Sequence, residues 1–190
     1  MPRPSVIRVA PTQVKEPHKM IELLQGDITQ LDVDAIVCPA HKYLSKGRGL
    51  SAIIHDKAGP DLDKACQELS DQCPAGQAVI TPGFDLPCRF IIHTVTPLWT
   101  GGDQWGGSTL SVLGDCFKNS LAIAEQNNFR SIAFPALGTG ASKTPHSIVA
   151  HEALEILQPA AERFERLTIC LHSAVELEEW EKVYRKFYGE

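Results

Sequence analysis

The chain alternates short apolar runs with stretches of helical periodicity, and this alternation constrains the fold more than any other feature. Six apolar runs have the length and residue types of strands, and they lie at 20–24, 33–37, 77–81, 89–95, 131–135 and 167–171. The spacing of apolar residues predicts helices at 50–58, 62–69, 108–126, 145–157 and 177–187. Strands that alternate with helices predict an α/β sandwich with a mixed, mostly parallel sheet and helices on both faces.

A single acidic residue follows the first of these strands. The segment Gly26-Asp27-Ile28-Thr29 joins the first two apolar runs through a turn. This position predicts a carboxylate at the rim of the sheet, where it can accept hydrogen bonds from a ligand. The alternative is a structural role for Asp27, as a capping residue or in an Asx-turn.

Two glycine-containing loops run into predicted helices. The first is Ser45-Lys46-Gly47-Arg48-Gly49, before the helix that starts at Leu50, and the second covers 137–142, before the helix at 145. A loop of this kind at a helix N-terminus presents free N–H groups to an anion. In α/β folds ligands bind at the carboxyl ends of the strands, so we expect both loops and Asp27 to converge there.

Composition narrows the class of protein. The net charge is −5, so we expect no broad surface for nucleic acid or for an anionic membrane. The six cysteines form no C-x-x-C pair and no zinc-type spacing with histidine, which predicts reduced thiols, no metal and a cytoplasmic location. No apolar stretch approaches the roughly 18 residues that span a bilayer, and the N-terminus has no apolar signal-peptide region.

The length of 190 residues predicts one folded domain at 20–190. Residues 1–19 mix Pro and charged residues, and we expect an extended or partly disordered leader there. The segment 99–107 contains two Trp and four Gly, which fits a mobile lid or a surface excursion.

The segments described so far resemble the macro domains over residues 20 to about 188. The resemblance is specific because many short matches occur in the right order and spacing. They are 26–29, 33–37, His55 with 58–60, 76–81, 91–95, 119–121 and 131–136.

The resemblance implies a three-layer α/β/α domain that binds ADP-ribose, free or attached to protein, in a cleft above the sheet. In the family the acid of the Gly-Asp-Ile-Thr segment accepts a hydrogen bond from the adenine amine, a role that falls on Asp27. The implied partner is ADP-ribose or an ADP-ribosylated protein, no metal or redox cofactor is implied, and we expect a monomer. The remaining implied ligand-binding residues are Ile28, Ala40, Gly47, Gly49, Leu50, Leu137, Gly138, Thr139, Gly140, Ala141 and Ser142.

This chain departs from the hydrolase branch of that family at two catalytic positions. His41 stands where the branch has an Asn that orients the distal ribose, and Ser51 stands where it has an Asp that positions water. His41 is a candidate general base and Ser51 a candidate catalytic hydroxyl. The alternatives are that His41 only fills the space of the Asn and hydrogen-bonds locally, and that Ser51 is an N-cap.

The second loop also lacks the family's aromatic over the distal ribose, because Ser142 occupies that position with Lys143 beside it. Lys46, Arg48 or Lys143 can offset this loss by pairing with the diphosphate, unless they only form a solvated surface. We interpret His55 and His93 as structural, and the spacing of His146 and His151 does not match a helical metal pair.

Three functions remain open from the sequence. The first is a module that binds ADP-ribose through Asp27 and the two loops. The second is a hydrolase of ADP-ribose esters, either O-acyl-ADP-ribose or mono-ADP-ribosylated protein, that uses substrate-positioned water with help from His41. The third is a degenerate macro domain that serves protein–protein contact.

Overall fold

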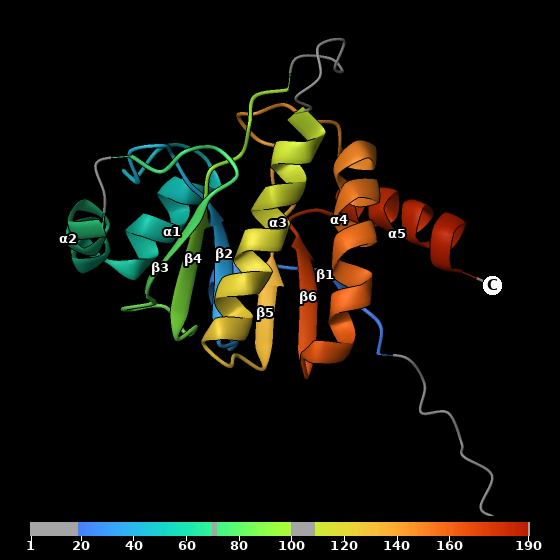
Figure 1. Cartoon of the computed structure of the whole chain (residues 1–190), viewed down its shortest axis with the longest axis horizontal. Coiled ribbons are helices and arrows are strands. Elements are labelled where there is room, and N and C mark those ends of the chain that lie inside the picture. Colours follow the sequence, from blue (N-terminus) through green and yellow to red (C-terminus); the bar gives the residue numbers. More distant parts are fainter. Residues whose placement is uncertain (1–18, 70–71, 100–108, 190) are drawn as a thin grey trace, which may run out of the picture.

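The computed structural model describes residues 19–69, 72–99 and 109–189, which form a layered α/β structure (Figure 1). The strands are β1 (Glu22–Gln25), β2 (Ala35–Pro39), β3 (Ala78–Pro82), β4 (Phe90–Thr94), β5 (Ser131–Phe134) and β6 (Arg166–Leu171). The helices are α1 (Leu50–Ala58), α2 (Pro60–Leu69), α3 (Thr109–Gln126), α4 (His146–Ala160) and α5 (Ala174–Tyr188), with 3-10 turns η1 (Ile28–Gln30) and η2 (Ala161–Arg163). None of the helices in these ranges is long and apolar enough to cross a membrane.

The strands form one mixed, mostly parallel sheet, as the sequence predicted. Their order across the sheet is β1-β6-β5-β2-β4-β3. All neighbouring pairs are parallel except β3 and β4, which are antiparallel. The central strand β2 is buried almost throughout, as expected for a strand covered on both faces.

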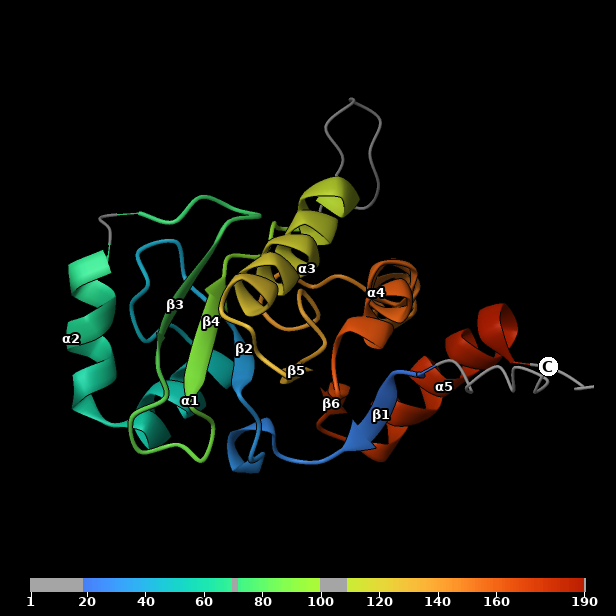
Figure 2. The ribbon, with the colours of Figure 1, turned by 60° about the horizontal axis from the view of Figure 1, so that its bottom comes forward.

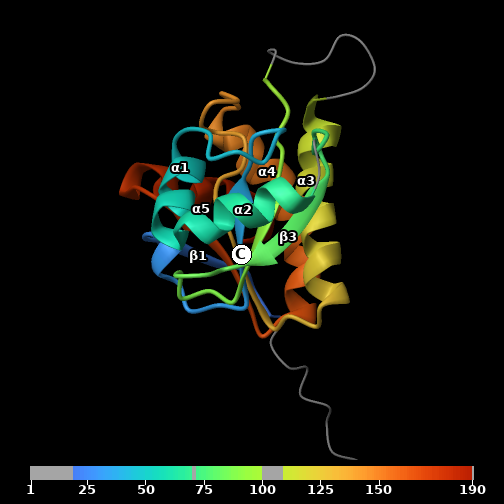
Figure 3. The same cartoon turned by 90° about the vertical axis from the view of Figure 1, so that its left-hand side faces the viewer.

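Helices cover both faces of the sheet and confirm the sandwich. In Figures 2 and 3, α1 lies on one side of the sheet and α3 on the other. The apolar core is accordingly divided into two clusters, one that includes Phe117 and Phe134 and one that includes Ile54 and Leu62. The last helix, α5, packs on α4 and on the edge strand β1. Its Trp180 is fully buried, and the indole Nε1–H donates to His146 Nδ1 at 3.3 Å.

Local capping explains where several helices differ from the expected ranges. The last helix begins before 177 because Ser173 and Glu176 form a capping box at its N-terminus. The second helix begins at Pro60, since proline fits a first helical turn. The predicted helix at 108–126 is α3, whose description starts at Thr109, and the predicted loop at 99–107 lies almost entirely outside the described residues.

Candidate functional site

Asp27 lies directly after β1, where Gly26 N–H donates to Leu171 O of the neighbouring strand at 2.8 Å. It is the N-cap of η1, and its Oδ1 accepts hydrogen bonds from Thr29 N at 2.9 Å and from Thr29 Oγ1 at 2.5 Å. The structural alternative for Asp27 is therefore present in the fold. This capping role leaves the carboxylate accessible, because 45% of the Asp27 side chain is exposed.

The second oxygen of Asp27 has a partner that the sequence did not indicate. Lys57, in the last turn of α1, donates from Nζ to Asp27 Oδ2 at 2.8 Å and to Thr29 Oγ1 at 3.0 Å. These two partners, Lys57 first and Thr29 second, lower the pKa of Asp27 to about 2. A half-exposed carboxylate that is ionised at neutral pH is a strong acceptor for a ligand N–H.

The loop that follows β2 holds His41 at the surface. Ala40 N–H donates to Thr94 O at 2.8 Å and so fixes the start of this loop. His41 Nδ1 accepts from Tyr43 N at 3.3 Å and lies 3.4 Å from Ser45 Oγ. Because Nδ1 accepts the hydrogen bond from Tyr43 N, we assign the ring proton of a neutral His41 to Nε2. The local hydrogen bonding that the sequence offered as an alternative is thus observed.

Ser51 does not cap its helix, which corrects that expectation. The N-cap of α1 is Gly49, whose φ of 57° suits glycine, and Ser51 is the second helical residue. Its side chain is buried, and its hydroxyl donates to Lys46 O at 2.8 Å. Ser51 therefore holds the loop against the helix, while no side chain caps the N-terminus of α1.

The three basic residues of the two glycine loops differ in whether they form ion pairs. Lys46 forms an ion pair with Asp56 of α1. Arg48 and Lys143 are exposed and have no ion pair within the part of the chain that the structure describes. These two cations are available to an anionic ligand.

In the described part of the chain, several backbone amides of the loop after β5 have no acceptor. Its turn is closed by Thr139 N donating to Ala136 O at 3.3 Å and by Thr144 N donating to Gly138 O at 2.8 Å. Across 19–69, 72–99 and 109–189, no residue accepts a hydrogen bond from the backbone N–H groups of Gly138, Gly140, Ala141 and Ser142. A group of free amides in one short loop is suited to the oxygens of a phosphate.

A hydroxyl pair ties this loop to the segment after β4. Ser142 Oγ lies 2.8 Å from Thr96 Oγ1, and Trp99 N donates to Ser142 O at 2.9 Å. Ser142, which replaces the expected aromatic, thus links this loop to the segment after β4.

These features share one rim of the sheet. Asp27, the 40–49 loop and the 137–142 loop follow the carboxyl ends of β1, β2 and β5, which are parallel strands of one sheet. Helix α1 links two of them, because Leu50 adjoins the first glycine loop and Lys57 contacts Asp27. Seven residues of α-helix span roughly 10 Å. The rim is therefore suited to an elongated ligand with a hydrogen-bond donor at one end and phosphates toward the other.

A mostly parallel α/β/α sandwich with amide-rich loops at the carboxyl edge of its strands defines a ligand-binding domain of the nucleotide-binding type. The chain belongs to the Macro domain family, whose model matches residues 37–153. This confirms the resemblance seen in the sequence.

Curated relatives and solved structures agree with this membership. The chain is 42% identical over 161 residues to the macro domain-containing protein RSc0334 of Ralstonia nicotianae, covering 85% of this chain and 92% of the relative. It is 42% identical over 168 residues to the O-acetyl-ADP-ribose deacetylase of Klebsiella pneumoniae, covering 87% and 94%. A mutant of the Oceanobacillus iheyensis macrodomain with ADPR matches with a TM-score of 0.82 and 31% identity, covering 88% of this chain and 93% of the other.

Proposed function

We propose that this chain binds ADP-ribose, free or attached to protein, along the rim between Asp27 and the 137–142 loop. The observation that carries the proposal is the group of four loop amides that have no acceptor among the described residues, at the same edge as a half-exposed, ionised carboxylate. In this arrangement the Asp27 carboxylate accepts a hydrogen bond from the adenine amine, and the backbone N–H of Ile28 assists. The ADPR in the Oceanobacillus iheyensis structure supports the choice of ligand.

The diphosphate and distal ribose are proposed to lie between the two loops. Gly47, Gly49 and Leu50, with Ala40 at the end of β2, form one side, and the 137–142 loop forms the other. Backbone amides suit two adjacent phosphates because several short donors can approach without side chains in the way.

Calorimetric titration of ADP-ribose tests the site through Asp27→Ala. A hydrogen bond to a charged group contributes about 1.5–3 kcal/mol, so the variant should bind about tenfold more weakly or worse. Asp32→Ala is the matched control, because Asp32 is an exposed carboxylate close by in the chain, and it should bind like the wild type. No saturable heat with the wild-type protein would contradict the proposal and favour the protein-contact function.

A second candidate function is hydrolysis of ADP-ribose esters. It is favoured by the similarity to the Klebsiella pneumoniae protein named O-acetyl-ADP-ribose deacetylase. In this proposal the bound diphosphate orients the ester, and a positioned water attacks it. His41 and Ser51 are the candidate catalytic side chains, although His41 Nδ1 and the Ser51 hydroxyl are both engaged within the loop.

Turnover of O-acetyl-ADP-ribose, followed by separation of the product, tests this function. The wild-type protein should release ADP-ribose. If the pH dependence of the hydrolysis rate disappears in His41→Ala, His41 is the general base. Binding without turnover would leave the chain as a binding module.

We further propose that residues 20–190 are the domain, and that it is a monomer in the cytoplasm with no nucleic-acid or membrane partner. All six cysteines are free and buried, which fits a reducing compartment.

A further inference from the structure

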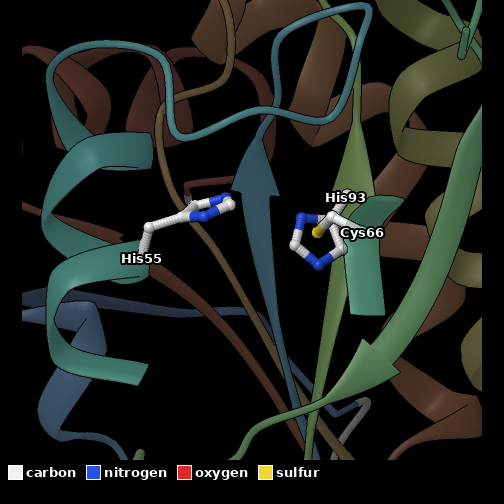
Figure 4. Close-up of side chains that lie close together, drawn as sticks. All are labelled: His55, Cys66 and His93. Carbon is white, nitrogen blue, oxygen red and sulfur yellow. The ribbon is translucent and has the colours of Figure 1, made fainter. Parts of the chain in front are cut away.

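Three side chains that the proposed function does not use meet beneath α1. They are His55 of α1, Cys66 of α2 and His93 of β4, and Figure 4 shows them facing one another. Their nearest nitrogen and sulfur atoms all lie within 4.8 Å of one another. The three residues are 3%, 1% and 0% exposed, so their side chains are buried.

An outer hydrogen bond orients the first histidine. His55 Nδ1 lies 2.6 Å from Oδ1 of Asp63 on α2. A carboxylate at this distance holds the ring proton on Nδ1, so Nε2 keeps its lone pair. Metal-binding histidines are commonly fixed by a carboxylate in this way.

The second histidine has one partner and one free nitrogen. His93 Nε2 lies 2.8 Å from Thr81 Oγ1. His93 Nδ1 is buried and has no hydrogen-bond partner among the residues that the structure describes. His93 is fully buried, and burial favours the neutral ring. The contact with Thr81 allows either tautomer, and zinc would select the one that donates from Nε2 and keeps the Nδ1 lone pair.

We propose that His55, Cys66 and His93 bind a zinc ion. Two imidazole nitrogens and one thiolate form a donor set that zinc takes in proteins, with a water molecule in the fourth position of the tetrahedron. Zinc would also satisfy the buried Nδ1 of His93, which otherwise carries the cost of an unpaired polar atom.

The charge balance of binding involves one proton. Zn²⁺ forms a bond to Cys66 Sγ, and the thiol proton leaves to solvent. Cys66 is buried, so the positive charge of zinc is what would make its thiolate favourable. The neighbouring thiol of Cys38, on β2, interacts with Ser51 instead and lies outside the group of three.

The proposed ion would join the helical layer to the sheet. His55 and Cys66 lie on α1 and α2, and His93 lies on β4, so one ion would link three elements. Helix α1 also carries the 45–49 loop at its start and Lys57 at its end. A zinc ion here would therefore raise the melting temperature and hold one side of the candidate ligand rim in place.

Metal titration of the chelator-treated, reduced full chain tests the proposal. The wild type should bind one zinc per chain, and Co²⁺ should give the visible absorption of a tetrahedral site with a thiolate-to-cobalt band in the near ultraviolet. Cys66→Ala should lose this band and weaken zinc binding by more than about 100-fold. Cys88→Ala is the matched control, because Cys88 is also a buried thiol with a pKa raised to about 11. This variant should keep the thiolate-to-cobalt band and the affinity for zinc.

A second pair of variants tests the site without removing a ligand. Asp63→Asn should weaken zinc binding about 10- to 100-fold by loosening His55, and its half-exposed position makes the change mild for folding. Asp61→Asn, an exposed carboxylate on the same helix, should bind zinc like the wild type. A wild-type protein that binds neither zinc nor cobalt, or a thiolate band that survives Cys66→Ala, would overturn the proposal. Both readouts are independent of ADP-ribose.

Discussion

The ammonium of Lys57 lies 2.8 Å from Oδ2 of Asp27, 30 positions away in the chain. This contact joins the last turn of α1 to the residue that follows β1, and it is made at one end of the candidate ligand rim. Through this contact Lys57 lowers the pKa of the Asp27 carboxyl.

Lys57→Met should raise the pKa of Asp27 from about 2 toward its ordinary value of 3.8, because the hydrogen bond from Lys57 is the largest cause of the shift. Carboxyl carbon shifts in an NMR titration measure this directly. Lys64→Met, which removes an exposed partner of Asp61, should leave Asp27 unchanged. An Asp27 pKa that stays near 2 in Lys57→Met would mean that Thr29 is the dominant partner.

The low pKa of Asp27 also predicts a dependence of stability on pH. The carboxylate protonates near pH 4 in the unfolded chain but only near pH 2 in the folded chain, so its contribution is complete above about pH 4 and is lost as pH falls toward 2. Asp27→Asn should therefore lose less stability than the wild type over that interval. The difference should be below about 1 kcal/mol, because the side chain is half exposed and screened by solvent. Urea unfolding at several pH values measures it, with Asp32→Asn expected to follow the wild type.

Gly138→Ala should destabilise the fold by about 1–2 kcal/mol, since Gly138 has a φ of +85° that L residues rarely adopt. A Cβ there would also lie 3.3 Å from Leu113 Cδ1 and from Thr144 Oγ1. Gly140→Ala is the control, because a Cβ there meets nothing within 4 Å. Thermal unfolding of the two variants should differ, and equal melting temperatures would show that the loop relaxes around the new methyl group.

Arg48→Gln should weaken ADP-ribose binding about two- to fivefold, as expected for the loss of an exposed charge pair with phosphate. Lys46→Gln should have less effect, because Lys46 is already paired with Asp56. Titration at low and at moderate ionic strength separates the two, since the Arg48 contribution should decrease with salt. A larger effect of Lys46→Gln would show that the Asp56 pair opens for the ligand.

The strands, helices and glycine loops were predictable because their signals are local. Leu50–Ala58 is the helix that the spacing predicted, and the carboxyl-edge position of the loops follows from parallel strands. The ligand roles of Asp27 and of the 137–142 loop stay predictions. Lys57 was missed because an exposed lysine in a helix carries no local signal of its partner.

The sequence by itself determined the layered α/β class and the macro domain membership, because apolar periodicity and short motifs are properties of neighbouring residues. Only the tertiary structure decided that the Ser51 hydroxyl donates to Lys46 O of the preceding loop and that Lys57 contacts Asp27. It also decided that His55, Cys66 and His93 meet. Their positions in the chain have no metal-ligand spacing, because the packing of α1 and α2 on the sheet, and not the chain between them, brings their side chains together.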